Sequence, residues 1–369
     1  MRALVTGANG FIGRNLVVRL RERADIEVST WTKADAPSSL GARVAAADFV
    51  FHLAGVNRPV DDSEFATGNA DLTRVLCDAV RAQHRPIPIV YSSSIQSDLV
   101  NPYGRSKRAA EDALKSLAAD GDHPAYIYRL PNVFGKWSRP NYNSVIATFC
   151  HNIARGLPIQ IRDPSAMLDL VYVDDVVDDF LRILREPRTQ VFQQVAVQYR
   201  SSLGELAAQL LEFEASRTSL VTPPVGVGLM RALYATYISF FPTEHFSYGL
   251  TKHEDARGIF VEMLKTKDSG QFSYFTAHPG VTRGGHYHHS KTEKFLVVRG
   301  EASFRFRHLV TGEFFEQRTS HLRPEVVETI PGWVHDITNV GPDEMIVMLW
   351  ANEIFDRQRP DTIASGMNE

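Results

Sequence analysis

The sequence is poor in cysteine and carries no excess of basic charge. Only two cysteines occur among 369 residues, Cys77 and Cys150, which is too few for a disulfide framework. We expect both to be small buried side chains in a protein of the reducing cytoplasm. The formal net charge is −3 and no basic run stands out, so nucleic acid is not an expected partner.

Long hydrophobic runs and an export signal are also missing. The most apolar window, residues 225–241, is interrupted by Arg231 and is too short to cross a bilayer. The first residues lack the charged-then-apolar pattern of a secretion signal. The expectation is a cytoplasmic protein that does not enter a membrane.

The chain is long enough for two domains, and its pattern of predicted secondary structure changes near residues 242–244. Before that point, apolar strands alternate with helical patterns, as in a doubly wound parallel α/β sheet. After it, alternating strands with Gly and Pro turns predict a small all-β barrel or sandwich. Nine of the 13 histidines also lie after residue 244. We therefore expect domains at 1–245 and 246–369.

The first predicted strand runs into a glycine-rich turn and then a helix. Glycines at this spacing permit a tight turn, a close approach to a pyrophosphate and close helix–strand packing. A plain strand–turn–helix is the alternative, but the position at the start of the chain favours a dinucleotide site. A later strand end would lie over the same cofactor. The predicted contacts are Gly7, Gly10, Phe11, Ile12, Gly13, Leu53, Ala54 and Gly55.

The identity of the dinucleotide is read after the second predicted strand, where an acid would bind the ribose of NAD. The stretch from Val28 to Lys33 contains no acid. Lys33 and Arg14 could instead neutralise a 2′-phosphate, so NADPH is the favoured cofactor. The alternative is that both cations are merely solvated.

A serine and a Tyr-x3-Lys pair carry the predicted chemistry of this domain. Ser94 ends a strand, and Tyr103 and Lys107 share one face of the next helix. An ammonium beside a phenol lowers the pKa of the phenol, which lets Tyr103 exchange a proton with a sugar oxygen. The serine hydroxyl can bond the same oxygen.

Histidines and a glutamate gather in the second domain. His286 and His288 are two apart and leave the same face of a strand. Glu293 follows five residues later, and His335 belongs to a separate segment. Three imidazoles and a carboxylate can hold a divalent metal or move a proton. A barrel with satisfied core histidines is the plain structural alternative.

Motifs along residues 1–240 resemble those of the extended short-chain dehydrogenase/reductase family, whose members mostly act on nucleotide sugars. They include the glycine turn, 52–55, Ser94, Tyr103-x3-Lys107, 129–135 and 171–175. The resemblance implies a Rossmann-like fold, catalysis by Ser94, Tyr103 and Lys107, and substrate contacts from Ser94, Asn132 and Arg129. Leu168 stands where many relatives carry a diphosphate-binding arginine.

The second domain resembles the cupins, in both of their motifs. In metal cupins, residues equivalent to His286, His288, Glu293 and His335 are ligands, and zinc is the expected ion. In the sugar epimerases of this fold, the first histidine is a general base. The resemblance thus leaves His286 and His288 as ligands, as catalytic residues, or as both.

The whole chain resembles the bifunctional capsular-polysaccharide enzymes of the CapF/WbjC family. This likeness implies that the cupin domain epimerises C3 of a UDP-2-acetamido-2,6-dideoxy-hexos-4-ulose. The reductase domain would then reduce the C4 ketone with NADPH, giving UDP-N-acetyl-6-deoxy-L-talosamine for capsule or O-antigen. A single-site reductase with a dimerising cupin is the runner-up, and a dinucleotide-sensing regulator is a third possibility. A homodimer is expected.

Overall fold

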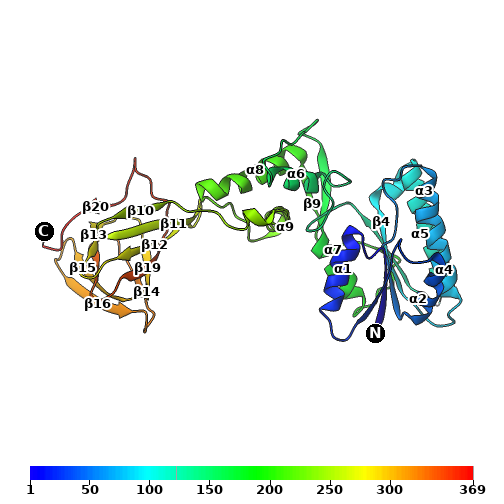
Figure 1. Cartoon of the computed structure of the whole chain (residues 1–369), viewed down its shortest axis with the longest axis horizontal. Coiled ribbons are helices and arrows are strands. Elements are labelled where there is room, and N and C mark those ends of the chain that lie inside the picture. Colours follow the sequence, from blue (N-terminus) through cyan, green and yellow to red (C-terminus); the bar gives the residue numbers. More distant parts are fainter. Residues whose placement is uncertain (122, 369) are drawn as a thin grey trace. The chain divides into compact units, whose positions relative to one another are not determined.

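The computed structural model describes residues 1–121 and 123–368, which form two compact units (Figure 1). One unit comprises Met1–Leu210 and Val227–Pro242, and the other comprises Leu211–Gly226 together with the chain from Thr243 onward. Among the described residues, no helix is long and apolar enough to cross a membrane.

The first unit is built on a six-stranded parallel sheet. Its strand order is β2-β1-β3-β4-β5-β8. In this order the strands are β2 (Glu27–Trp31), β1 (Arg2–Thr6), β3 (Phe49–His52), β4 (Ile89–Ser94), β5 (Ala125–Leu130) and β8 (Phe192–Gln193). Because parallel strands end at one edge, the residues after β1, β3 and β4 gather there.

Helices cover both faces of this sheet (Figure 1). One layer holds α1 (Phe11–Arg21) and α7 (Val173–Ile183), whose buried side chains include Leu16 and Phe180. The other holds α2 (Leu40–Ala46), α4 (Leu72–Arg81) and α5 (Pro102–Ala119), which bury Leu76 and Leu114. Burying each such side chain stabilises the fold by roughly 1.5–3 kcal/mol. Both cysteines are buried, as predicted.

Smaller elements complete this unit. A three-stranded sheet has the order β6-β7-β9, and a π-helical turn, η2 (Ala66–Asp71), precedes α4. Further elements are α3 (Ser63–Phe65), β6 (Asn132–Phe134), α6 (Val145–Ile153), β7 (Met167–Tyr172), β9 (Tyr199–Ser202) and α9 (Gly228–Ile238). The helix α8 (Leu203–Ser219) begins in this unit, and its residues from Leu211 onward belong to the other.

The second unit consists of two antiparallel sheets with an apolar core that includes Phe295, Phe304 and Val347. One sheet contains β10 (Lys252–Asp255), β11 (Gly258–Thr266), β12 (Gly270–Ala277), β19 (Met345–Ala351), β14 (Glu293–Arg299) and β17 (Val326–Glu328). The other contains β16 (Phe314–Ser320), β15 (Glu301–His308), β18 (Trp333–Asn339), β13 (Thr282–Tyr287) and β20 (Ile363–Ala364). The predicted fold class, a Rossmann-like sheet followed by an all-β cupin-like unit, is confirmed.

Candidate functional sites

The glycine turn packs too tightly for side chains. Gly7 has a φ of +70°, and a Cβ there would lie 2.5 Å from the Ala54 nitrogen. A Cβ on Gly13 would lie 2.2 Å from the Gly7 carbonyl oxygen. The end of β1, the start of α1 and the end of β3 therefore approach one another closely, and the N-terminus of α1 at this point can attract an anionic group.

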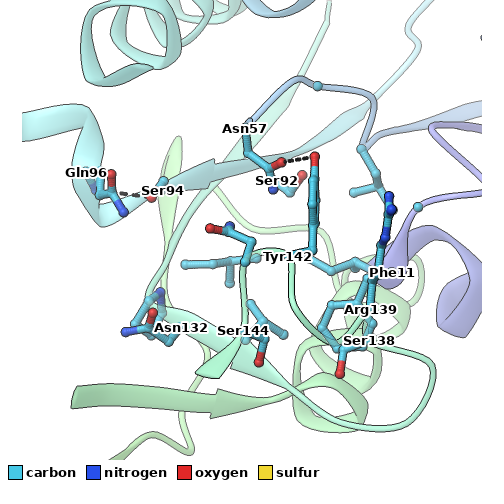
Figure 2. A pocket seen from close by; sticks show the side chains of 18 of the residues that line it. Phe11, Asn57, Ser92, Ser94, Gln96, Asn132, Ser138, Arg139, Tyr142 and Ser144 are labelled. Carbon is cyan, nitrogen blue, oxygen red and sulfur yellow. Dashed lines mark hydrogen bonds between the residues drawn. The ribbon is translucent and has the colours of Figure 1, made fainter. Parts of the chain in front are cut away.

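A cavity of about 740 Å³ lies at the carboxyl edge of the parallel sheet (Figure 2). This is where ligands bind in open α/β sheets. Most of the predicted cofactor and substrate residues line it: Gly10, Phe11, Ile12, Gly13, Arg14, Leu53, Gly55, Ser94, Tyr103 and Asn132. The structure thus brings the glycine turn, the serine and the tyrosine to one place.

Ser94 and Tyr103 enter the cavity from β4 and the first turn of α5. The Ser94 hydroxyl accepts a hydrogen bond from the Gln96 backbone nitrogen at 3.1 Å (Figure 2). Asn101 caps α5 by accepting from the Gly104 nitrogen at 2.6 Å, which fixes where the helix, and with it Tyr103, begins. Burial raises the pKa of Tyr103, and interaction with the Ser94 hydroxyl lowers it, so the pKa lies above its ordinary value.

Lys107, one helical turn after Tyr103, is buried and is not among the residues that line the cavity. Its ammonium donates to the Tyr91 hydroxyl at 3.2 Å and to the Ser92 carbonyl oxygen at 2.9 Å. Burial lowers its pKa to about 8. The predicted influence of Lys107 on the pKa of Tyr103 stays a prediction, while burial and the Ser94 hydroxyl are the causes that the structure itself supplies.

Some predicted site residues lie away from the cavity. Gly7 and Ala54 lie close to each other but do not line the cavity. Lys33 is exposed on the chain beyond β2 and does not line it either. Arg129 turns toward carboxylates instead: it pairs with buried Glu111 at 2.6 Å and with Asp98 at 3.1 Å. Arg129 is thus committed to an internal ion-pair network, which does not support a substrate contact.

Several cavity residues were not anticipated from the sequence. The Tyr142 hydroxyl donates to Asn57 Oδ1 at 2.8 Å (Figure 2). The Arg139 guanidinium lies 5.0 Å from the centre of the Tyr142 ring. Trp137 and Phe65 also line the cavity. Their segments carry no motif with a chemical spacing, so the sequence did not reveal them as cavity residues.

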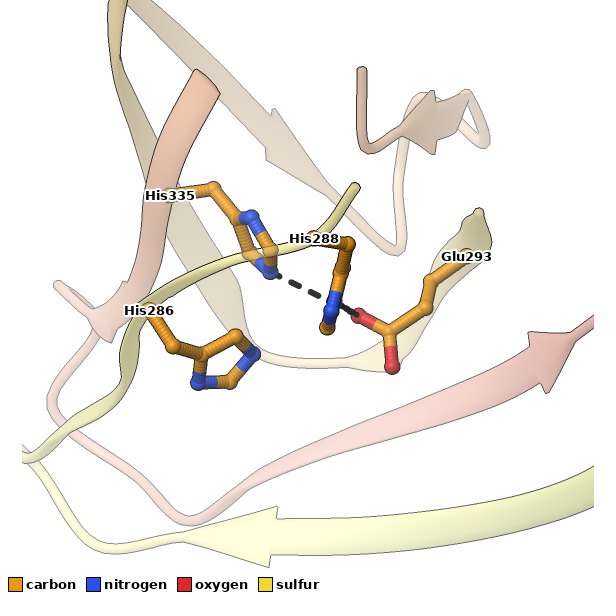
Figure 3. A group of neighbouring side chains, drawn as sticks. All are labelled: His286, His288, Glu293 and His335. Atoms are coloured by element: carbon orange, nitrogen blue, oxygen red, sulfur yellow. Dashed lines mark hydrogen bonds and ion pairs between the residues drawn. The ribbon is translucent and has the colours of Figure 1, made fainter. Parts of the chain in front are cut away.

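The four predicted metal residues converge in the second unit (Figure 3). Their ligand atoms all lie within 4.8 Å of one another, and His288, Glu293 and His335 are buried while His286 is half-buried. His286 pairs with His335 across β13 and β18, after a bulge that follows Gly284. The bulge re-aims the strand so that His286 faces His335.

Hydrogen bonding in this cluster leaves acceptors facing one another. His288 Nδ1 donates to the Asp361 carbonyl oxygen, so its Nε2 faces Glu293 Oε2 at 3.2 Å. His335 Nε2 lies 3.5 Å from the same oxygen, and neither ring nitrogen of His335 has a hydrogen-bond partner among the described residues. A shared cation, a metal ion or a proton, resolves this arrangement. The donor set of three imidazoles and one carboxylate fits zinc.

The charge states of the cluster suit the same interpretation. Burial lowers the pKa of His286 to about 4, and His335 adds to this, so the imidazole is neutral at pH 7. Burial works to raise the pKa of Glu293, but the adjacent His288 and His335 rings and the Lys291 ammonium outweigh it, and the pKa falls well below its ordinary value. A carboxylate and a neutral imidazole are the forms that ligate metals.

Two family models match separate parts of the chain. Residues 3–197 match the model of the NAD dependent epimerase/dehydratase family. Residues 253–363 match the model of the polysaccharide biosynthesis C-terminal domain.

Two relatives match the chain over its whole length. One, from Pseudomonas aeruginosa, is 60% identical over 370 residues, covers 100% of both chains, and is named UDP-2-acetamido-2,6-beta-L-arabino-hexul-4-ose reductase. The other is the crystal structure of the capsular polysaccharide assembling protein CapF from Staphylococcus aureus. It has a TM-score of 0.93 and 40% identity, and the match covers 99% of this chain and 100% of that one. The chain belongs to the CapF/WbjC family. It is an oxidoreductase of the NAD-dependent epimerase/dehydratase type joined to a polysaccharide-biosynthesis domain.

The N-terminal fold is shared more widely. A UDP-glucuronic acid 4-epimerase from Bacillus cereus, solved with NAD, has a TM-score of 0.56 at 19% identity. That match covers 65% of this chain and 96% of the epimerase. At this identity the likeness shows the fold alone.

Proposed function

We propose that this protein is a bifunctional nucleotide-sugar enzyme. The second unit epimerises C3 of UDP-2-acetamido-2,6-dideoxy-hexos-4-ulose, and the first reduces the C4 ketone with NADPH to UDP-N-acetyl-6-deoxy-L-talosamine. The observation that carries the proposal is that one chain holds a Ser94–Tyr103 pair in a cavity beside a glycine turn and, separately, a cluster of three histidines and a glutamate. The name of the Pseudomonas relative supports the substrate class.

The first unit supplies the groups that a ketone reduction needs. When bound, the nicotinamide cofactor provides a hydride. Tyr103 then gives its phenolic proton to the sugar oxygen, and the Ser94 hydroxyl bonds the same oxygen as charge develops on it. The raised pKa of Tyr103 keeps the phenol protonated, and therefore able to donate, at neutral pH. Arg14 lies at the cavity beside the glycine turn, where it can neutralise a 2′-phosphate.

The second unit supplies a base and a cation site. A hydrogen on the carbon beside a ketone is acidic, so a base can remove it and it can return from the other face. We assign the base to His286, because it is the most accessible of the four residues and is neutral at pH 7. His288, Glu293 and His335 would hold a zinc-type ion beside this base, and such an ion, when bound, would stabilise a developing enolate. The later reduction draws the near-thermoneutral epimerisation forward.

Deuterium exchange tests both halves separately. The full-length protein is incubated with the 4-keto UDP-sugar in deuterated water without NADPH. We expect deuterium at C3 with the unaltered protein and none with His286→Ala. Tyr103→Phe should still exchange deuterium, but it should fail to oxidise NADPH when the cofactor is added in a second assay. No exchange by the unaltered protein refutes the epimerase half. NADPH oxidation by Tyr103→Phe at the unaltered rate refutes the assigned proton donor.

A reductase with a purely structural second unit is the second candidate. The name of the Pseudomonas relative, which mentions only a reductase, favours it. This candidate predicts that an already epimerised substrate is reduced while NADPH is oxidised, with no incorporation of deuterium at C3. The same exchange experiment therefore separates the two candidates.

A further inference from the structure

The carboxylate of Asp361 anchors the loop that carries His288. It accepts hydrogen bonds from three consecutive backbone nitrogens, those of His289 at 2.8 Å, Ser290 at 2.7 Å and Lys291 at 2.8 Å. The Ser290 hydroxyl adds a fourth at 3.0 Å. Consecutive N–H groups that point at one anion form a strong, specific cradle. These bonds also hold the pKa of Asp361 well below its ordinary value.

The same residue contacts His288 directly. The backbone carbonyl oxygen of Asp361 accepts from His288 Nδ1. A carbonyl oxygen can only accept, so Nδ1 must carry the proton. The other ring nitrogen, Nε2, is then the atom presented to Glu293. The side chain and the main chain of one residue thus fix both the loop and the orientation of the ring.

The chain after Asp361 extends this attachment along β13. β20 pairs with β13, with Ala364 opposite His286 and Ile363 opposite Tyr287. The Ser365 nitrogen then donates to the Gly285 carbonyl oxygen at 3.0 Å. The strand that bears His286 and the loop that bears His288 are therefore held by one segment, residues 361–365.

We propose that Asp361 is a positioning residue for the histidine–glutamate cluster, which holds His288 with Nδ1 protonated and Nε2 aimed at the metal position. The inference rests on the proposed metal centre, since it concerns residues that would ligate the ion. Partners that orient a ligating histidine typically change metal affinity about 10- to 100-fold when they are lost. Asp361 lies 68 residues after Glu293 and 26 residues after His335 in the sequence, so no local motif marks it.

The test compares full-length Asp361→Ala, Asp361→Asn and Asp361→Glu with a matched control. Asp356→Asn serves as the control, because Asp356 accepts from the Gln358 nitrogen in the chain just before that segment. Zn²⁺ affinity is measured by competition with a chelating dye. We expect Asp361→Ala to bind about 10- to 100-fold more weakly, Asp361→Asn to bind at intermediate strength, and Asp356→Asn to match the unaltered protein.

A spectroscopic measurement separates positioning from general stability. In metal-free protein labelled with ¹⁵N-histidine, the Nδ1–H correlation of His288, assigned with His288→Gln, should be visible and protected from exchange. It should disappear in Asp361→Ala, remain in Asp356→Asn and return in Asp361→Glu, which restores a carboxylate. Circular dichroism and urea unfolding identify a variant that has lost its fold, in which case Asp361→Asn decides.

Two results overturn the inference. One is an unchanged His288 signal in the folded Asp361→Ala variant, and the other is an unchanged Zn²⁺ affinity of that variant. If the unaltered protein binds no Zn²⁺, the proposed metal centre fails, but the His288 signal still decides whether Asp361 orients the ring. Failure of the proposed function and failure of this inference are thereby distinguishable.

Discussion

The ammonium of Lys107 and the hydroxyl of Tyr91 lie 3.2 Å apart inside the first unit, and the same ammonium lies 4.7 Å from the centre of the Tyr91 ring. Both side chains are buried. Tyr91 therefore contacts the buried Lys107 ammonium through both its hydroxyl and its ring.

Replacing this tyrosine should shift the pH dependence of the reductase. Burial already lowers the pKa of Lys107 to about 8, so activity that requires the charged ammonium falls as pH rises through that value. Tyr91→Phe removes a hydrogen-bond acceptor of the charged form, which lowers the pKa further. We expect the alkaline limb of kcat/KM for NADPH oxidation to move to lower pH. Tyr126→Phe, at a buried tyrosine of β5, is the control. The same alkaline pKa of kcat/KM in the unaltered protein, Tyr91→Phe and Tyr126→Phe would contradict the prediction.

The second unit should become more stable on binding zinc. A ligand at 100 times its Kd stabilises the folded state by about 2.7 kcal/mol. We expect added Zn²⁺ to raise the Tm of the transition that belongs to this unit, and a chelator to reverse the change. His335→Gln should abolish the shift because it removes a buried ligand. His253→Gln, at an exposed position of β10, should leave it intact. A shift that persists in His335→Gln would place the ion elsewhere.

His52 should make the first unit sensitive to acid. Burial, aided by the charge of Lys107, lowers its pKa to about 3, and its ring nitrogens bond the Thr6 and Thr73 hydroxyls at 2.8 and 2.9 Å. The unfolded chain has the ordinary pKa of about 6.5. Below that value the unfolded state binds a proton that the folded state does not, so stability is present above pH 6.5 and is lost as pH falls toward 3.

Linkage sets the size of this effect at about 2 kcal/mol between pH 7.5 and pH 5. Urea unfolding at both values measures it. His52→Gln should lose about 2 kcal/mol less than the unaltered protein over the same interval, whatever its absolute stability. An identical pH dependence of the two proteins would show that His52 takes up a proton while folded.

The glycine turn should not tolerate a methyl group. Gly13→Ala brings a Cβ to 2.2 Å from the Gly7 carbonyl oxygen, so α1 must move away from β1 and the cofactor cradle opens. We expect the Kd for NADPH, measured by fluorescence titration, to rise at least tenfold. Gly41→Ala is the matched control, since its Cβ would meet nothing within 4 Å. That change lies in α2 and should stabilise the protein by roughly 0.5–1 kcal/mol. Unchanged NADPH binding by Gly13→Ala would contradict the assigned cradle.

Local patterns were enough to predict the two architectures and most of the cavity. The glycine spacing, the strand that ends at Ser94 and the helix that carries Tyr103 each depend on neighbours in the sequence, so periodicity and turn chemistry reveal them. The histidine cluster could be anticipated for a similar reason, because three of its four members fall within eight residues. The homodimer and the cytoplasmic location stay predictions.

The sequence did not reveal which distant side chains contact one another. Tyr142 meets Asn57 across 85 residues, and Arg129 finds Glu111 on a helix rather than the substrate cavity. A long cationic side chain reaches in several directions, and which carboxylate it meets depends on how helices pack on the sheet. Whether Arg129 binds substrate or pairs with a buried carboxylate therefore depends on the packing of the fold. The sequence motif around Arg129 is the same in either case.

Glu293 divides its two carboxylate oxygens between different neighbours. Oε2 faces His288 and His335, whereas Oε1 accepts from the Lys291 ammonium at 2.7 Å. The single negative charge of this buried group is thus already balanced by a lysine. A divalent ion seated among the histidines would bring a surplus of positive charge to the interior of the barrel, and that surplus would attract molecules that are anionic or become so as they react.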